Sequence, residues 1–242
     1  MRVIKLTVGY DGTDFCGWQR QQGDRTVQGE IEEALAKLAE RRIPVVGAGR
    51  TDAGVHALGQ VASFRAALRL EKDELLRALN SLLPADVRIT SVRTAPPGFD
   101  ARKAARSKVY RYRIFNGARI SPFLFRYVLH WPGRLDFERM AEAARLFKRK
   151  ADFTAFSSNR LLHPVRRVMR SELRKKGPEI IYTIEADGFL RYMVRAIVGT
   201  LLEVGRGKVD PRTIEDLFAE KKRSLASPTA PAKGLCLVRV IY

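Results

Sequence analysis

The chain has 242 residues, of which 45% are hydrophobic and 9% are aromatic. This length and composition fit a folded protein of one large or two small domains and exclude a mainly disordered chain. Lysine and arginine number 45 against 26 acidic residues, so the formal net charge is +19 and the expected partners are polyanions: RNA, DNA or an anionic membrane. No apolar run reaches the ~20 residues of a membrane-spanning helix, and residues 1–10 lack the apolar core of a signal peptide. We therefore expect a cytoplasmic protein with no membrane partner.

Cysteine and histidine are few and scattered along the chain. The cysteines are Cys16 and Cys236, and the histidines are His56, His130 and His163. None of their spacings is that of a metal-ligand motif, so we expect no structural zinc and two reduced cysteines.

In residues 1–100 the patterns typical of strands and helices alternate. Apolar residues from Val27 to Leu38 recur with helical spacing behind Thr26, which is a suitable N-cap. The complete expected order is strand 3–12, helix 27–38, strand 43–49, strand 60–66, helix 71–84 and strand 86–96. This βαββαβ order predicts a ferredoxin-like or RRM-like unit.

A similar order recurs after a basic linker at 96–107 that contains proline and glycine. The expected elements are strand 108–116, helix 135–147, a strand pair within 164–187 that turns at Gly177-Pro178, helix 188–205 and strand 234–242. The sequence thus predicts an α+β protein of two βαββαβ halves, residues 1–100 and 101–242, whose antiparallel sheets join side by side with an active-site cleft between them. The duplication is inferred from element order, because the two halves share little sequence identity.

Residues 47–60, GAGRTDAGVHALGQ, place one carboxylate, Asp52, among glycines and alanines. Small residues let a backbone approach a ligand closely, and Gly54 permits dihedral angles that larger residues avoid. Arg50 lies two residues before Asp52 and can either pair with the carboxylate, which would lower its pKa and keep it ionised, or bind a phosphate. The alternative is structural: a turn at the end of a strand, in which Asp52 caps a backbone N–H. His56 is better explained as a hydrogen-bonded structural residue.

Residues 188–205 predict the longest helix of the chain, with one broad apolar face. Arg191 and Arg195 would lie one turn apart on the remaining stripe, where like charges repel by a few tenths of a kcal/mol. We expect a solvated position for Arg191, and a buried carboxylate or a phosphate beside Arg195.

The strand KVYRYRIFN, residues 108–116, alternates aromatic and basic residues. Tyr110 and Tyr112 point to one side and Arg111 to the other. Core packing explains both tyrosines, and the alternative is that one of them stacks on an extruded RNA base. Lys108 and Arg111 are candidate RNA contacts. Further basic clusters lie at 102–108, 145–150, 166–170 and 221–223, and together they suit a long phosphate track.

Several separate stretches resemble one known family, the TruA-type tRNA pseudouridine synthases, over essentially the whole chain. These stretches are YDGTDFCGWQRQ (10–21), GAGRTDAGVHALGQV (47–61), KVYRYRIFN (108–116), DFTAFSS (152–158), RYMVRAIVGTLLEVG (191–205) and APAKGLCLVRVIY (230–242). The resemblance implies an enzyme that isomerises uridines on the 3′ side of the tRNA anticodon stem-loop. It also implies a homodimer that needs neither a cofactor nor an essential metal.

The resemblance also assigns roles to single residues. Asp52 matches the catalytic aspartate, Tyr110 the active-site tyrosine, and Arg195 the arginine that pairs with the aspartate. Leu235 matches the aliphatic residue that packs on the target base, and Arg50 matches an arginine thought to act in tRNA binding and base extrusion. Arg191 joins the candidate RNA contacts through its charge.

Three positions depart from the family pattern. Tyr192 stands where a histidine is usual, Asp187-Gly188 replaces a pair that contains asparagine, and Cys236 replaces a common aromatic residue.

The reaction that the resemblance implies explains why a single carboxylate, Asp52, would suffice. Pseudouridine formation breaks the N1–C1′ bond, turns the uracil in place and joins C1′ to C5, which needs no redox step and no energy input. Asp52 can attack C1′, add to C6 or remove the C2′ proton, and the sequence leaves these three routes open. The rival readings are an RNA-binding protein without activity and a metal-dependent nuclease, and the second lacks clustered metal ligands near Asp52.

Overall fold

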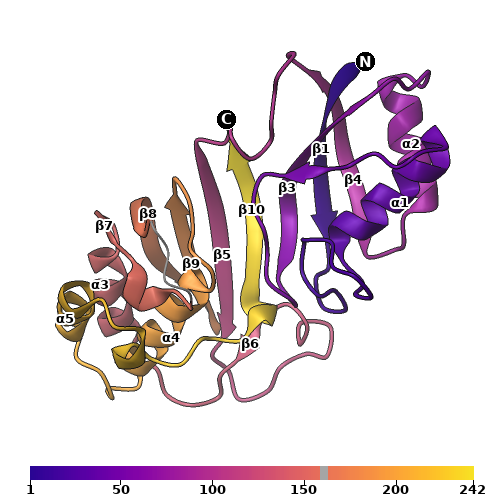
Figure 1. Ribbon diagram of the computed structural model, residues 1–242. Helices are drawn as coiled ribbons and strands as arrows, with labels where there is room; N and C mark the ends of the chain where they lie inside the picture. Colours follow the sequence, from indigo (N-terminus) through magenta and orange to yellow (C-terminus); the bar gives the residue numbers. More distant parts are fainter. Residues whose placement is uncertain (159–162) are drawn as a thin grey trace. The chain divides into compact units, whose positions relative to one another are not determined.

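A computed structural model describes residues 1–158 and 163–242, which form α+β structure in two units (Figure 1). The first unit contains Met1–Arg106 and Cys236–Tyr242, and the second contains Ser107–Leu235. The α+β class agrees with the sequence prediction. The last strand, which the sequence pattern placed with the second half, pairs in parallel with a strand of the first unit through Cys236 and Leu237.

The first unit has the predicted βαββαβ order. Its elements are β1 (Arg2–Tyr10), α1 (Val27–Ala39), β2 (Val46–Gly47), β3 (His56–Ala66), α2 (Lys72–Leu82) and β4 (Val87–Ala95), followed at the end of the chain by β10 (Leu235–Ile241). Strand β1 is antiparallel to both β3 and β4, β2 is antiparallel to β3, and β10 is parallel to β3. Helices α1 and α2 contact each other and lie beside the sheet (Figure 1).

Local sequence explains why α1 forms where it does. The side chain of Thr26 accepts a hydrogen bond from the Gly29 N–H, as an N-cap should. The predicted apolar stripe is buried, with Ile31 and Leu35 fully enclosed. Glu32, on the same buried side, accepts hydrogen bonds from the Val45 N–H at 3.1 Å and from the Gln28 amide at 2.9 Å.

That contact with Glu32 also explains why β2 is shorter than predicted. A strand was expected over 43–49, but only Val46–Gly47 pairs with β3. Ile43 and Val45 are buried, and the Val45 N–H bonds to the Glu32 carboxylate instead of to a neighbouring strand.

The second unit is a mainly antiparallel sheet with helices packed on it. Its strands are β5 (Ser107–Phe115), β6 (Leu129–His130), β7 (Lys150–Asp152), β8 (Val165–Lys176) and β9 (Glu179–Ala186), and its α-helices are α3 (Phe137–Leu146), α4 (Met193–Gly205) and α5 (Thr213–Glu220). Strands β5, β9, β8 and β7 are neighbours in that order and each pair is antiparallel, while β6 runs parallel to β5. The predicted turn at Gly177-Pro178 is confirmed between β8 and β9.

Helix α3 packs between α4 and strand β8, and α5 is joined to the same layer. The carboxylate of Glu215 in α5 accepts two hydrogen bonds from the Arg149 guanidinium, at 2.5 and 2.8 Å. The hydrogen bonds from Arg149 hold the pKa of Glu215 below its ordinary value. Among the described residues, none of the helices combines the length and the apolar character that crossing a bilayer requires.

The helix expected over 188–205 begins later than the sequence pattern indicates. Helix α4 starts at Met193, because Tyr192 adopts a left-handed backbone conformation with φ 64° and ψ 2°. The prediction that Arg191 and Arg195 share one helical stripe is therefore wrong, since Arg191 precedes the helix. Phe189, which the pattern placed on the apolar helix face, instead packs edge-to-face on the Tyr110 ring at 5.0 Å between centroids.

Candidate functional site

The Asp52 loop joins β2 to β3, and the residue just before Asp52 anchors it to the rest of the unit. Thr51 is buried, its hydroxyl shares a hydrogen bond of 2.8 Å with the Tyr10 hydroxyl, and its carbonyl accepts from the Trp18 N–H at 3.1 Å. Burial raises the pKa of the Tyr10 phenol, so this hydroxyl stays neutral. Asp52 itself is half-buried, and its carbonyl accepts from the Val55 N–H at 3.1 Å, which closes a turn.

Glycines on the facing segment let that loop come close. A Cβ at Gly12 would lie 2.0 Å from the Val55 carbonyl oxygen, and one at Gly17 would lie 2.6 Å from the Thr51 oxygen. Gly17 also has φ 92°, which larger residues rarely adopt. Residues 11–18 and the Asp52 loop are therefore packed backbone to backbone.

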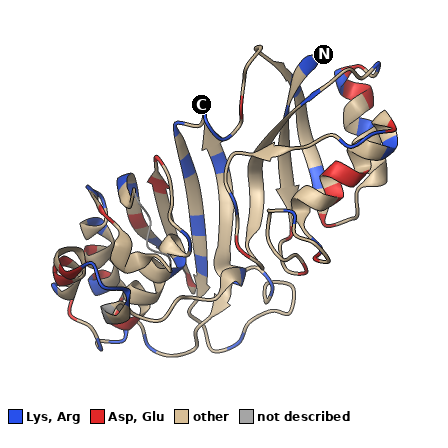
Figure 2. Ribbon diagram, viewed as in Figure 1, with Lys and Arg blue, Asp and Glu red and all other residues tan. Residues whose placement is uncertain are grey.

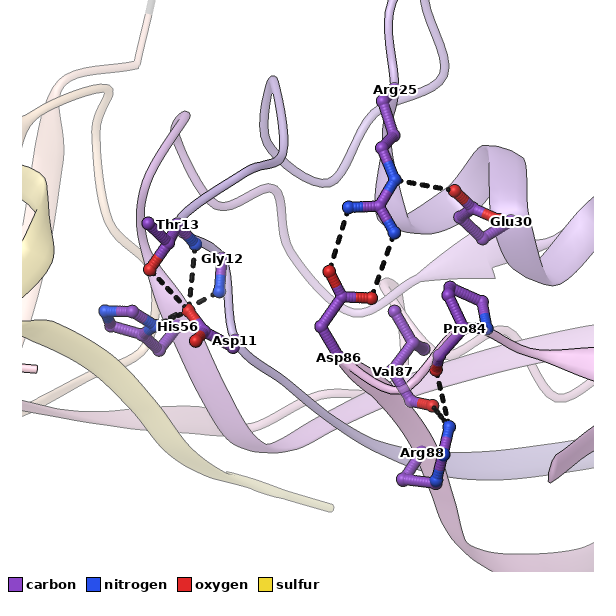
Figure 3. Close-up of polar contacts among 10 residues, drawn as sticks. All are labelled: Asp11, Gly12, Thr13, Arg25, Glu30, His56, Pro84, Asp86, Val87 and Arg88. Atoms are coloured by element: carbon purple, nitrogen blue, oxygen red, sulfur yellow. Dashed lines mark hydrogen bonds and ion pairs between the residues drawn. The ribbon is translucent and has the colours of Figure 1, made fainter. Parts of the chain in front are cut away.

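Two groups of polar contacts fix the ends of the 11–26 segment (Figure 3). At one end, His56 Nδ1 lies 3.1 Å from both the Gly12 nitrogen and the Asp11 carboxylate, so the start of β3 is joined to the end of β1. At the other end, the Arg25 guanidinium donates twice to Asp86, at 2.8 and 3.0 Å (Figure 3). The structural interpretation of His56 fits these contacts.

Arg50 lies at the exposed edge of the Asp52 loop. Its Nε donates to the Gln19 side-chain oxygen at 3.0 Å. Gln19 belongs to the rim of an open polar pocket of about 620 Å³ that the 19–29 segment forms with Glu33 and Arg42. The guanidinium is thus oriented toward the solvent side of the loop, where a phosphate can reach it.

Tyr110 is buried in β5, and so are the alternate residues Tyr112 and Ile114. Both tyrosines therefore pack in the core, as one of the two interpretations of this strand predicts. The Tyr112 hydroxyl donates to the Pro231 carbonyl at 2.8 Å, and burial raises its pKa. Tyr110 keeps 6% of its surface exposed and packs on Phe189, so its ring lies at the border of the core.

Arg195 lies in the first turn of α4 and is half-buried. Its Nε donates to the Ala230 carbonyl at 2.8 Å, and the Ala230 N–H donates back to the Arg195 carbonyl at 3.0 Å. The centre of its guanidinium lies 4.9 Å from the centroid of the Tyr192 ring, and that of Arg191 lies 5.0 Å from the same ring. An aromatic ring therefore contacts both guanidinium groups, a contact that the sequence pattern did not predict.

Leu235 is the first residue of β10 and is 5% exposed. A short 3-10 helix, Ala232–Gly234, leads into it. A Cβ at Gly234 would lie 2.6 Å from the Tyr112 ring, so this turn packs directly on the second tyrosine of β5. Tyr110, Arg195 and Leu235 all belong to the second unit, whereas Asp52 belongs to the first.

Basic side chains follow β5 and β8 (Figure 2). On β5, Arg111 is exposed and Lys108 is partly exposed. Some members of the predicted phosphate track are engaged with acids: Arg170 bonds to Glu172, and Arg149 bonds to Glu215. In the described part of the chain, no three His, Cys, Asp or Glu side chains come together as metal ligands would.

Comparison with known proteins decides the family. A model of the family described as tRNA pseudouridine synthase matches residues 6–102 and 143–242. The chain belongs to the tRNA pseudouridine synthase family. It is accordingly an isomerase that converts uridine to pseudouridine in tRNA.

Relatives of this family match over nearly the full chain. Three proteins named tRNA pseudouridine synthase A illustrate this. The protein of Thermodesulfovibrio yellowstonii is 44% identical over 99% of this chain and 99% of its own length. The protein of Methylacidiphilum infernorum is 46% identical over 98% and 94%, and that of Moorella thermoacetica is 43% identical over 100% of both chains. Among solved structures, an archaeal box H/ACA sRNP Nop10-Cbf5 complex is 12% identical with a TM-score of 0.34, and the match covers 91% of this chain and 68% of that one.

Sequence reasoning missed the residues that hold the candidate site in place. Tyr10, Trp18 and Gly12 lie in the stretch 10–21, which was noted only for its family resemblance, although its glycines and aromatic residues indicate close packing. Tyr192 was noted only as a departure from the family pattern. No local signal indicated that Tyr192 would contact two arginines.

Proposed function

We propose that the chain isomerises uridines on the 3′ side of the tRNA anticodon stem-loop and that Asp52 is the catalytic carboxylate. The observation that carries this proposal is that, in a chain of this family, hydrogen bonds and burial fix the backbone of the Asp52 loop. Thr51, the residue next to Asp52, is buried and bonded to both Tyr10 and Trp18. Such a hold on a neighbouring backbone suits a carboxylate that must be placed against one atom of a substrate.

The proposed roles of the other site residues follow from their chemistry. Asp52 must be ionised to act at C1′, at C6 or on the C2′ proton, and Arg195 is the cation proposed to keep it so. Tyr110 and Leu235 are proposed to hold the uracil between an aromatic and an aliphatic surface while it turns. Enclosure of the base also excludes water, which would otherwise hydrolyse a detached sugar intermediate.

The proposed RNA contacts are cationic and accessible. Arg50 and Arg191 are exposed, as is Arg111, and Lys108 is partly exposed. Phosphates positioned by these side chains would bring the stem-loop to the site, and a flipped uridine would then reach Asp52. We also propose that the protein acts in the cytoplasm as a homodimer and without a cofactor.

Release of tritium from C5 of uracil tests the reaction directly, because the new C1′–C5 bond expels the C5 hydrogen. On an unmodified tRNA transcript the wild type should release tritium, and Asp52→Asn should bind the transcript but release none. Asp73→Asn, an exposed acid on α2, is the matched control and should react normally. Turnover by Asp52→Asn would contradict the assignment.

A second transcript tests the site of modification. In a transcript labelled at C5 of every uracil, replacing the uridines on the 3′ side of the anticodon stem-loop by cytidine should abolish tritium release, although the other uridines still carry the label.

Arg195→Met should slow the single-turnover rate more than it weakens tRNA affinity. A normal rate in that variant would contradict its pairing with the carboxylate.

A further inference from the structure

The segment between β5 and β6 exposes aromatic rings to solvent. We call residues 117–127, GARISPFLFRY, the aromatic–basic loop. Phe123 is 88% exposed, Phe125 is 54% exposed and Tyr127 is 39% exposed, and among the described residues no other aromatic side chain is so accessible. Large exposed apolar patches are rare on protein surfaces, and they often mark interaction sites.

The loop has a defined backbone that presents these rings. The Leu124 N–H donates to the Ser121 carbonyl at 3.0 Å, and the Tyr127 N–H donates to the Leu124 carbonyl at 2.9 Å. Two consecutive turns therefore fix the segment, which lies in the loop between β5 and β6 (Figure 1). A partner that binds these rings does not have to order a free chain first.

The charge around the rings is entirely positive along the sequence. Residues 117–135 contain Arg119, Arg126 and Arg134 and no aspartate or glutamate. Lys233 adds a fourth cation, with its Nζ 4.3 Å from the centroid of the Phe125 ring. Lys233 is two residues before Leu235, so the loop contacts the same turn that carries the proposed base-packing residue.

We propose that the aromatic–basic loop is an RNA-binding surface on which an unpaired base of the tRNA stacks, with Phe123 as the stacking platform. Exposed aromatic rings between cations are the recurring chemistry of single-stranded RNA recognition. A second copy of the chain is a less suitable occupant, because a symmetric contact would bring the loop's cations together without an acid from 117 to 135 to compensate them. The inference rests on the proposed function, since it takes tRNA as the ligand.

Substitutions at Phe123 distinguish the effect of an aromatic face from the effect of apolar volume alone. Phe123→Leu removes the stacking face and should weaken the affinity for an unmodified tRNA transcript by about fivefold or more. Phe123→Trp retains a face and should bind within about twofold of the wild type. Leu82→Ala, which trims an exposed apolar side chain at the end of α2, should change nothing. Equal affinities for Phe123→Leu and the wild type would overturn the proposal.

The cations of the loop give an independent measurement. Arg119 is exposed, and Arg119→Gln should lower the steepness of log K against log salt by about 0.7, the value for one phosphate of a single strand. Arg77→Gln on α2 is the charge-matched control and should leave that slope unchanged. An unchanged slope in Arg119→Gln would count against the loop as a phosphate contact.

Two readouts keep the alternatives apart. Sedimentation of Phe123→Leu without RNA should give the wild-type mass, and a change in oligomeric state with unchanged tRNA affinity would assign the loop to a copy-to-copy interface and overturn the proposal. Tritium release by Asp52→Asn reports on the proposed function alone. If Asp52→Asn releases no tritium and Phe123→Leu still binds normally, the loop inference fails while the assignment of Asp52 stands. If Asp52→Asn releases tritium and Phe123→Leu binds weakly, the assignment of Asp52 fails while the loop inference stands.

Discussion

Tyr192 is the residue whose substitution most directly tests the geometry around Arg195. Its ring lies about equally far from two guanidinium groups, 4.9 and 5.0 Å between group centre and centroid, and its backbone has φ 64°. Each cation–π contact at a half-exposed site is worth about 0.5–1 kcal/mol, so the ring contributes about 1–2 kcal/mol to the folded state. The left-handed conformation of a non-glycine residue costs about 1–2 kcal/mol.

Three substitutions separate these two terms. Tyr192→Leu loses both ring contacts and keeps the backbone cost, so its free energy of unfolding should fall by about 1–2 kcal/mol. Tyr192→Gly loses the same contacts but relieves the left-handed conformation, so it should be about 1 kcal/mol more stable than Tyr192→Leu. Tyr192→Phe keeps the ring and loses only the 3.3 Å contact between the hydroxyl and Arg191, so it should resemble the wild type.

Urea denaturation at pH 7 measures these free energies, and single-turnover tritium release measures the consequence for the reaction. If the ring positions Arg195, Tyr192→Gly should react more slowly than the wild type by about fivefold, although its stability is nearly restored. Tyr192→Phe should react normally. Equal stability of the leucine and glycine variants would refute the argument from backbone strain, and a wild-type rate in Tyr192→Gly would refute the argument from ring position.

Three further perturbations follow from contacts described above. Gly12→Ala places a Cβ 2.0 Å from a carbonyl oxygen and should cost about 1–3 kcal/mol with loss of activity, whereas Gly9→Ala meets only ordinary contacts at 3.6 Å and should be mild in both assays. Glu32→Ala leaves the Val45 N–H without its acceptor and removes one of the two acceptors of the buried Gln28 amide, which still donates to the Val45 carbonyl. It should cost about 3 kcal/mol in urea titrations, while the exposed Glu33→Ala should cost less than about 0.5 kcal/mol. Glu215→Gln should cost about 0.5 kcal/mol at pH 7, since its ion pair is exposed. Because folding lowers the pKa of Glu215, this stability is fully present above the unfolded pKa of about 4.3 and is lost as the pH falls through the folded pKa, so the difference between the two proteins should shrink steadily as the pH falls below about 4.3.

The sequence predicts the elements of the first unit well because their patterns are strong and local. The stripe of α1 and the N-cap at Thr26 are both confirmed. Strand β2 is the exception, since the β-branched residues Ile43, Val45 and Val46 resemble a strand whatever group accepts their N–H bonds. Only the folded structure reveals that Glu32 accepts the bond from Val45.

The start of α4 could not be predicted for a similar reason. Helical periodicity continues from Met193 back to Phe189, and nothing local interrupts it. The break arises from tertiary contacts: Phe189 packs on Tyr110, and Leu190 is buried. With the chain anchored there, Tyr192 takes up the change of direction in its left-handed backbone.

The structural interpretation of the Asp52 loop holds in the folded chain, and the proposed chemical role of Asp52 is compatible with it. The turn exists, since the Val55 N–H bonds to the Asp52 carbonyl. The close approach that fixes it, however, depends on glycines outside the loop, at positions 12 and 17, whose missing Cβ atoms let two backbones touch. The glycines on the facing segment therefore leave room for the protein's own backbone, whereas the proposed function asks the small residues of the Asp52 loop to leave room for a substrate. A carboxylate can be both accessible and rigidly placed only when both kinds of space are provided, and this is why substitution at Gly12 should impair the reaction without touching the substrate.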